Sequence, residues 1–258
     1  MAIYNITSQQ LKGTGILNSF EIAAGGVYSN IRSLDFDGTD DFVDCGDADN
    51  LSFGDGSNDS AFSISLWLKM EGGSAVRHRF VNKMGADNEY YMGTTGGGGL
   101  YLALYDASTG GRIMRFGPSL NAYRDAWVHL VVTYDGSSSS NGITGYVNGS
   151  LTSQWFTANS GTYTAMENTT SPLLLGKTAQ ESYKTEGKMD EIAIFNSELS
   201  ATDIENIYNS GVPNDISSLS PLSWWRFEEG SGTTATDSGT GGNNGTINGA
   251  TYSTDVPS

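Results

Sequence analysis

The sequence predicts an all-β fold, a sandwich of two antiparallel sheets with one short helix. The 258 residues include 34 glycines but only 5 prolines, and charged residues make up 16% of the chain. Such a composition favours short strands joined by tight turns over long charged helices. The length suits one large β-sandwich with a single core.

The charge of the chain limits its partners. The formal net charge is −16, which repels phosphate backbones and anionic lipid surfaces, so we expect neither nucleic-acid nor membrane binding. No stretch approaches the roughly 20 apolar residues of a membrane span, and the start lacks the basic and apolar pattern of an export signal. Cys45 is the only cysteine, so no disulfide forms within the chain and we expect a buried thiol.

The chain begins with a segment of weak pattern. Residues 1–32 show no strong hydrophobic period, and we interpret them as an N-terminal arm with a docking role. The pattern changes at Leu34, where the segment LDFDGTDDFV (34–43) alternates apolar and acidic residues on either side of a turn at Gly38. This arrangement predicts a hairpin-like pair of strands.

The middle of the chain carries a series of strand patterns. Residues 62–70 alternate apolar and mainly polar side chains, as in a half-buried strand. Short apolar segments at 79–84, 89–93 and 99–106 are separated by turns rich in Gly, Asp or Asn, which predicts an antiparallel meander. Residues 127–136 are apolar on both alternations, which is typical of a central strand covered on both faces.

The later elements begin with a hairpin tip at Asn148-Gly149, a pair that suits a type I′ turn. Residues 171–177 and 188–195 are predicted strands. The single helix is expected to begin at an N-capping Ser200 and to stop at Gly211 and Pro213. The residues that mark its first turn and its buried face are Asp203, Ile204, Ile207 and Tyr208.

These segments, in this order, resemble the laminin G-like family of bacterial and viral proteins, of the kind found in marine phage proteins. The family is similar in fold to pentraxins and to the concanavalin A-like lectins and glucanases. The resemblance covers about residues 33–211, and it implies a concanavalin A-like jelly-roll sandwich that we place at 33–258. The matching segments are 34–43, 62–69, 80–83, 127–136, 145–150, 173–177 and 187–208.

The C-terminal tail departs from the family order. A segment like residues 224–252 normally precedes the LDFDG motif in the family, whereas here it comes last. Either the domain is circularly permuted, with 221–252 as the permuted strand segment, or a second repeat is cut short. We expect permutation, with Trp225 and Phe227 in the core and Arg226 solvated beside Trp224.

No catalytic residues are predicted. The glucanases of this superfamily carry a Glu-x-Asp-x-x-Glu pattern, which is absent here. Asp190 and Glu191 are adjacent in a predicted strand, so we expect their carboxylates to project to opposite faces. His78 and His129 have no nucleophile motif nearby and are expected in the core or at its rim. We therefore predict that the chain is not an enzyme, with a degenerate glucanase as a remote alternative.

A calcium site is implied by the resemblance to pentraxins. Asp87 and Asn88 occupy a place similar to the pentraxin Asp-Asn pair that ligates Ca²⁺, and Gln180 and Glu181 would supply further oxygens. Lys177 intrudes in that second loop, so a plain turn at Asp87 and Asn88 remains the alternative. The acidic residues between 35 and 49 lack the spacing of an EF-hand and are interpreted as a solvated strand face with Asp turns.

Two exposed aromatic residues are candidates for ligand binding. Trp155 and Phe156 follow the predicted hairpin in a polar context, where aromatic rings often stack on sugars. Packing in the core or in an interface is the alternative.

The leading functional hypothesis is a non-enzymatic protein of the phage virion surface: a capsid decoration, a fibre or a tail appendage. Its support is the resemblance to viral laminin G-like proteins, which extends to the tail at 209–246. The expected partners are other virion structural proteins and a cell-surface glycan, within a homo-oligomer or a larger assembly. The alternative is a soluble Ca²⁺-dependent lectin that binds bacterial polysaccharide.

Overall fold

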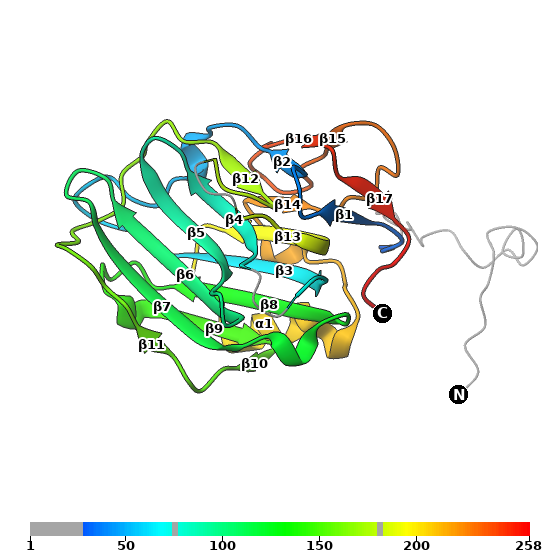
Figure 1. Ribbon diagram of the computed structural model, residues 1–258, viewed down its shortest axis with the longest axis horizontal. Coiled ribbons are helices and arrows are strands. Elements are labelled where there is room, and N and C mark those ends of the chain that lie inside the picture. Colours follow the sequence, from blue (N-terminus) through cyan, green and yellow to red (C-terminus); the bar gives the residue numbers. More distant parts are fainter. Residues whose placement is uncertain (1–27, 74–76, 180–182) are drawn as a thin grey trace, which may run out of the picture.

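The computed structural model describes residues 28–73, 77–179 and 183–258, and it shows two antiparallel sheets packed face to face (Figure 1). The predicted class, an all-β concanavalin A-like sandwich with one short helix, is confirmed. Most of the predicted N-terminal arm, residues 1–27, lies outside the described residues, and residues 28–32 carry no strand. None of the helices in the described part of the chain is long and apolar enough to cross a membrane.

Eight strands form the first sheet, which we call sheet A. In spatial order they are β10 (Ser150–Leu151), β9 (Ile143–Val147), β8 (Trp127–Tyr134), β3 (Phe62–Met70), β13 (Glu186–Phe195), β1 (Ser33–Asp37) and β17 (Thr251–Ser253), with β14 (Ser223–Trp225) also paired to β13.

Nine strands form sheet B. In spatial order they are β11 (Phe156–Thr157), β7 (Gly111–Ser119), β6 (Gly99–Asp106), β5 (Asn88–Thr94), β4 (Arg79–Met84), β12 (Leu173–Leu175), β2 (Phe42–Asp44), β16 (Gly245–Asn248) and β15 (Thr234–Ala235). Strands β4 to β7 are consecutive neighbours, which confirms the predicted meander.

The main core lies between the two sheets. Ile64 and Leu66 on β3 belong to it, as do Leu102 and Leu104 on β6, and none of the four has exposed surface. Burial of such a side chain contributes about 1.5–3 kcal/mol. The central position of β8, between β9 and β3, is confirmed, and its residues 128–134 are all buried.

The tip of the β9–β10 hairpin has the predicted backbone. Asn148 and Gly149 have φ values of 50° and 73°, the positive φ that a type I′ turn requires. Asn148 also accepts a hydrogen bond from the backbone NH of His129 through its side-chain oxygen, at 2.9 Å. This contact fixes the tip against the neighbouring strand β8.

The predicted hairpin at 34–43 is wrong in its pairing. Strand β1 belongs to sheet A and β2 to sheet B, so the turn at Gly38 (φ 73°) carries the chain across the sandwich. Phe36 and Val43 therefore reach the same core from opposite sides, each with no exposed surface. Alternation places one side of each strand in the core but does not say which strand lies next to it.

Helix α1 (Ala201–Tyr208) begins as predicted and ends earlier. Ser200 and Asp203 form a reciprocal capping box at its start. The helix ends at Tyr208 because Asn209 adopts a left-handed conformation with φ 45°, a role that asparagine can fill like glycine. Gly211 follows in the 3₁₀ turn Asn209–Gly211, one of five such turns in the described chain, the others being Asp49–Leu51, Asn121–Tyr123, Ser140–Gly142 and Ser217–Leu219.

The C-terminal tail supplies strands β14 to β17 to both sheets. Strand β14 pairs with β13, β16 with β2 and β17 with β1, while β15 pairs with β16. Trp225 and Phe227 have no exposed surface and join the main core. Trp224, which alternation places on the other face together with Arg226, is only 4% exposed and packs with Ile204 and Ile207 of helix α1 in a second core on the outer face of sheet A. Alternation did not predict this second core, because it forms only where the helix covers the sheet.

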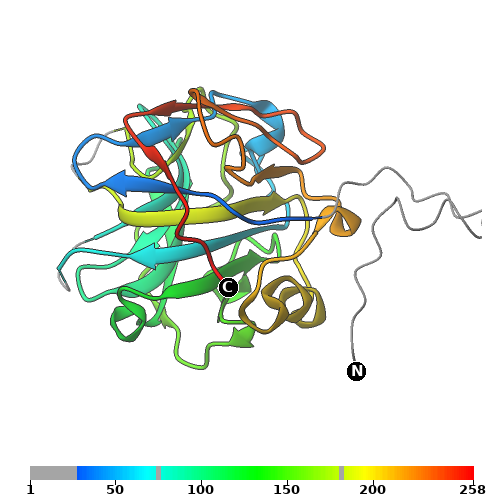
Figure 2. The same cartoon turned by 90° about the vertical axis from the view of Figure 1, so that its right-hand side faces the viewer.

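The last residues cross the outer face of sheet A near β1, β3 and β8 (Figure 2). The carboxylate of Asp255 accepts hydrogen bonds from Lys69 Nζ at 2.7 Å and from Trp127 Nε1 at 2.9 Å. Ser33 Oγ donates to the Asp255 carbonyl at 2.7 Å. These contacts hold the chain end against the strands that it crosses.

Candidate functional site

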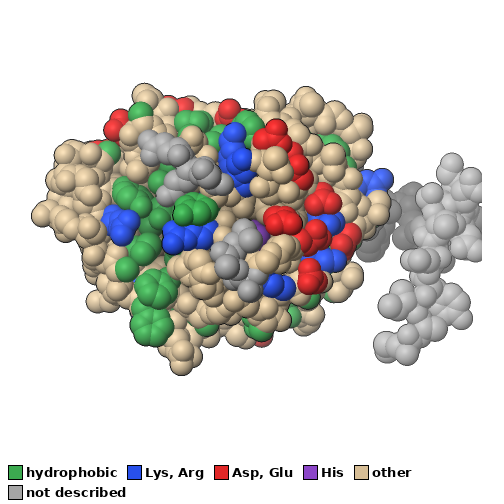
Figure 3. All heavy atoms as spheres, viewed as in Figure 1, with side chains coloured by type: hydrophobic (Ala, Val, Ile, Leu, Met, Phe, Trp, Pro, Cys, Tyr) green, Lys and Arg blue, Asp and Glu red, His purple; other side chains and the backbone are tan. Residues whose placement is uncertain are grey.

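Aromatic residues gather on the outer face of sheet B. Because alternate residues of a strand point to opposite faces, the burial of Leu102 and Leu104 in the core turns their neighbours on β6 outward. Figure 3 shows a hydrophobic band with basic side chains on this face of the molecule, apart from the main group of acidic side chains. The outward cluster consists of Met84, Tyr91, Tyr101, Ala103, Tyr105, Met114 and Phe116.

The tyrosines of this face hold one another in place. The ring of Tyr91 meets that of Tyr101 edge to face at 4.9 Å between centroids, and it stacks beside Tyr105 at 5.7 Å. The guanidinium of Arg79, whose residue is 1% exposed, lies 5.0 Å from the Tyr91 ring and 5.6 Å from the Tyr101 ring. These contacts form a rigid aromatic floor.

A pocket of about 210 Å³ opens over this floor. Its lining comes from the segment before β4, from β5 and the turn that follows it, and from β6 and β7. The lining residues are Arg77, Tyr91, Thr95, Tyr101, Arg112 and Met114. Burial raises the pKa of Tyr105 beside it, with the proximity of Tyr91 adding to the shift. The Tyr105 hydroxyl is therefore neutral at physiological pH, and it donates a hydrogen bond to the Tyr91 hydroxyl at 3.4 Å.

The two aromatic residues predicted as ligand contacts lie on different faces. Phe156 on β11 is 57% exposed and stacks on Phe116 at 5.5 Å, which extends the aromatic face to the edge of sheet B. Trp155 packs instead against the main core, over the backbone of Gly117 and Gly145. Trp155 precedes strand β11, which begins at Phe156, so the two rings leave the chain in different local settings.

The predicted calcium ligands are brought together only in part. Asp87 and Asn88 are adjacent at the turn into β5, whereas Gln180 and Glu181 lie outside the described residues. The Asp87 carbonyl accepts hydrogen bonds from the Gly85 NH and from a serine hydroxyl, as a turn residue would. The exposed Asp87 side chain borders a hollow of about 380 Å³ that Glu167 and Asn168 also line.

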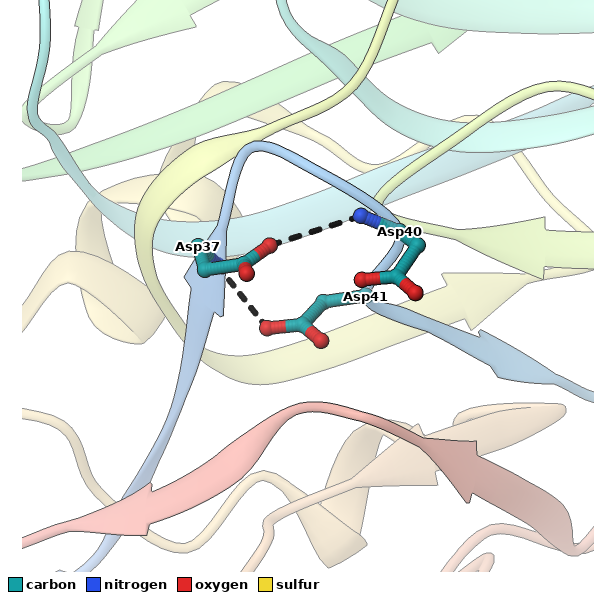
Figure 4. Close-up of side chains that lie close together, drawn as sticks. All are labelled: Asp37, Asp40 and Asp41. Atoms are coloured by element: carbon teal, nitrogen blue, oxygen red, sulfur yellow. Dashed lines mark hydrogen bonds between the residues drawn. The ribbon is translucent and has the colours of Figure 1, made fainter.

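Three acidic residues meet at the turn after β1. Figure 4 shows Asp37, Asp40 and Asp41, whose oxygens lie within 4.8 Å of one another. The Asp37 carboxylate accepts from the NH groups of Thr39 at 2.7 Å and Asp40 at 3.4 Å, and Asp41 accepts from the Asp37 NH at 2.9 Å. Burial, then the neighbouring carboxylates, raises the pKa of Asp41. These hydrogen bonds of the Asp37 and Asp41 carboxylates stabilise the turn between β1 and β2.

The prediction that Asp190 and Glu191 point to opposite faces is wrong. The pairing of β13 with β3 shifts between Asp190 and Ala193, and Glu191 has a φ of 49°, so a bulge turns both carboxylates to the outer side of sheet A. Asp190 is fully buried and Glu191 is 5% exposed. They bond Asn30 and Trp224, at 2.9 and 2.6 Å.

His129 also differs from a catalytic group in its surroundings. Its Nε2 lies 2.9 Å from the Ser65 hydroxyl, and both residues are buried beneath the rings of Trp67 and Tyr208. Burial lowers the pKa of His129 to about 3, so the imidazole is neutral. The pair is a packed core contact without access for a substrate.

The fold is that of a jelly-roll sandwich of the concanavalin A type. The profile of the concanavalin A-like lectin/glucanases superfamily, in its laminin G-like form, matches residues 37–205. The chain belongs to this family. A search of curated protein sequences finds no match.

Solved structures are similar at the level of the fold. One is a candidate carbohydrate-binding protein from Bacteroides ovatus, at a TM-score of 0.57 and 18% identity over 89% of this chain and 62% of its own. The binding domain of Paraclostridial Mosquitocidal Protein 1 and the receptor-binding domain of botulinum neurotoxin D each score 0.48 at 16% identity. Each covers 71% of this chain, and 46% and 44% of its own length respectively. The chain thus spans less than two thirds of these proteins.

Proposed function

We propose that this chain is a non-catalytic saccharide-binding module and that the outer face of sheet B is its binding surface. The observation that carries the proposal is the pocket that Tyr91 and Tyr101 line together with Arg77 and Arg112. Membership of a superfamily that contains lectins supports it, as does the fold shared with the candidate carbohydrate-binding protein of Bacteroides ovatus.

The chemistry of the pocket suits a sugar ring. A pyranose presents C–H groups on its faces, which pack on aromatic rings, and hydroxyls around its rim, which need hydrogen-bond partners. Tyr91, Tyr101 and Met114 offer the apolar contact, while Thr95 and the guanidinium of Arg112 offer polar groups. The ring contacts already present in the free protein lower the ordering cost of binding.

Hydrolysis is not part of the proposal, because glycosidases need two carboxyl groups on either side of the scissile bond. Among the residues that the structure describes, the lining of the pocket contains no carboxylate. The buried pair Asp190 and Glu191 lies on the other sheet, under packed side chains.

We also propose that the module is displayed on the surface of a phage virion, as a capsid decoration, fibre or tail appendage. The support is the sequence resemblance to viral laminin G-like proteins, tail included. In this setting its partners would be other virion proteins, in a homo-oligomer or larger assembly. Mass spectrometry of purified particles tests this part: the chain should be found in them, and its absence would contradict display.

A glycan array and a hydrolysis assay test the module itself. The purified protein should bind a defined set of glycans, and incubation with those glycans and with β-glucans should release no reducing ends. An array without any bound glycan would contradict saccharide binding. Reducing-end release that disappears in an Asp190→Asn variant would contradict the non-catalytic assignment.

A further inference from the structure

A hollow of about 650 Å³ lies where helix α1 meets the tip of the β9–β10 hairpin, at the edge of sheet A (Figure 1). Its walls come from residues 148–150 of the hairpin, from within residues 205–210 at the end of the helix and in the turn after it, and from Asn214. Small-molecule pockets commonly measure about 300–1,000 Å³. We infer that this hollow is a second ligand site and that it takes a neutral saccharide unit. The site lies on the other sheet from the pocket over the aromatic floor and does not depend on that pocket.

Both walls of the hollow are fixed in the free protein. The Tyr208 ring stacks beside the rings of Trp67 and His129, with centroids 5.8 and 6.0 Å away. A Cβ atom on Gly149 would lie 2.9 Å from Cδ1 of Tyr208, so only glycine allows the hairpin tip to approach the helix this closely. Asn148 is held to strand β8 through its bond with the His129 NH. A site that is formed before the ligand arrives loses less conformational entropy on binding.

Hydrogen-bond acceptors line the helix side of the hollow. The amide nitrogen of Asn214 donates to the Asn206 carbonyl at 3.0 Å, while its Oδ1 is buried without a hydrogen-bond partner in the described structure. The amide nitrogen of Asn209 likewise donates to the Val212 carbonyl at 3.1 Å, which leaves its oxygen to accept. The exposed Glu205 adds a carboxylate. A buried acceptor is unfavourable until a donor reaches it, and a ligand hydroxyl is such a donor.

Donors and an aromatic ring complete the lining. Asn148 uses its side-chain oxygen in the bond to His129, so its amide nitrogen is the end that can donate. The hydroxyls of Ser150 and Ser210 can donate or accept. Each hydroxyl of a saccharide also donates and accepts, and the C–H faces of the sugar can pack on the Tyr208 ring. The lining therefore matches the polar rim and the apolar face of a sugar.

The charge of the lining favours a neutral ligand. Among the lining residues that the structure describes, Glu205 alone carries a charge. An anionic ligand would be repelled by this carboxylate and by the net charge of −16. A lone Ca²⁺ holds its oxygen ligands at about 2.3–2.6 Å, so it would leave most of a hollow of about 650 Å³ unfilled. A neutral sugar fits both the volume and the mixture of donors and acceptors.

NMR titration of the isotope-labelled full chain tests the inference. The probes are the methyl glycosides of glucose, galactose, mannose and N-acetylglucosamine, each added alone. At least one of them should shift the backbone amide resonances of Gly149 and Asn209 with saturation. The amides of Tyr91 and Tyr101 report separately on the pocket over the aromatic floor, so binding at either site is recognised on its own.

Two variants assign the binding to the hollow. Glu205→Ala removes an exposed acceptor and should weaken binding of the active glycoside about tenfold or more, as loss of a hydrogen bond to a charged group does. Ser150→Trp places a large ring at an exposed lining position and should abolish the saturable shifts of Gly149 and Asn209. Glu198→Ala is the matched control, because it removes an exposed carboxylate just before helix α1, outside the hollow, and should leave the affinity unchanged.

Three results would overturn the inference. The first is no saturable shift of Gly149 and Asn209 with any of the four glycosides. The second is a saturable shift that survives both variants of the hollow. The third is the same shift produced by CaCl₂ alone, which would identify a cation site instead. Shifts at Tyr91 and Tyr101 alone would retain the proposed function without this site, whereas shifts at Gly149 and Asn209 alone would retain this site without that function.

Discussion

The indole Nε1 of Trp224 donates a hydrogen bond to Oε2 of Glu191 at 2.6 Å, and so joins the C-terminal tail to the central strand β13. The guanidinium of Arg226 adds a contact to the other oxygen of Glu191 at 3.3 Å and lies 5.0 Å from the Trp224 ring. Asn30 bonds the neighbouring Asp190 from the other end of the chain. Residues from both the N-terminal and the C-terminal segment thus bond the bulge in β13.

Loss of the indole hydrogen bond of Trp224 should lower the free energy of unfolding more than loss of a tryptophan hydrogen bond to a neutral group. Trp224→Phe leaves the buried Glu191 with one donor fewer, which we expect to lower the free energy of unfolding by about 1–3 kcal/mol. The matched variant is Trp155→Phe, whose indole donates to the neutral hydroxyl of Thr152, with an expected loss of about 0.5–1.5 kcal/mol. Urea titration measures both. A smaller loss in Trp224→Phe than in Trp155→Phe would contradict the account.

The same carboxyl makes stability depend on pH. Burial raises the pKa of Glu191 from 4.5 to about 7, so the folded state holds a proton that the unfolded state releases. Its contribution to stability is full below pH 4.5 and is lost as the pH rises to about 7. His78 and His129, whose pKa values burial lowers to about 4 and about 3, act in the opposite direction.

A variant isolates the carboxyl from the histidines. Glu191→Gln keeps an acceptor for Trp224 but cannot titrate, so the stability of the wild type minus that of the variant should fall between pH 4.5 and 7. Thermal melts across this range measure the difference. A difference that stays constant or rises with pH would show that the carboxyl is not held protonated in the folded protein.

The tail is proposed to complete the sandwich, as a permuted segment rather than a truncated repeat. Trp225 and Phe227 are two buried rings of about 150–250 Å² each, which at about 25 cal/mol per Å² correspond to roughly 7–12 kcal/mol. This is comparable with a typical net stability of about 5–15 kcal/mol. A chain of residues 1–214 should therefore aggregate or fail to melt cooperatively. A soluble fragment as stable as the full chain by calorimetry would contradict this.

Calcium binding at Asp87 and Asn88 remains a proposal with a direct test. A bound ion would raise stability by mass action, by about 2.7 kcal/mol at a hundredfold excess over the dissociation constant. The Tm should rise in millimolar Ca²⁺ and fall with chelator, and Asp87→Ala should remove the response. Asp40→Ala, in the other acidic turn, should retain it. An unchanged Tm, or a response lost only in Asp40→Ala, would contradict the site.

Strand positions follow from local pattern, and the sequence predicted them well. The alternation of 62–70 and the two-sided apolar pattern of 127–136 correspond to strands β3 and β8. The Asn148-Gly149 turn has the positive φ values that a type I′ turn requires. Ser200 caps the helix as expected. These features depend on residues within a few positions of one another.

The failures depend on contacts between distant segments. The bulge at Glu191 reverses the face of one side chain, and no residue type in the run marks it. Trp224 is covered by a helix about twenty residues earlier in the chain. The candidate pocket needs four segments side by side, so its arginines and tyrosines appear unrelated in the sequence.

Calorimetric titration of one pocket variant tests the central claim, saccharide binding by the outer face of sheet B, most directly. Tyr91→Leu removes a ring from the floor of the pocket at similar volume, and Tyr146→Leu is its counterpart on the outer face of sheet A. With a glycan that the wild type binds, Tyr91→Leu should weaken affinity about tenfold or more, since ring stacking contributes about 1–3 kcal/mol per base in comparable stacking sites. Tyr146→Leu should bind as the wild type does. Equal affinity of Tyr91→Leu and the wild type, with both variants folded, would contradict the claim.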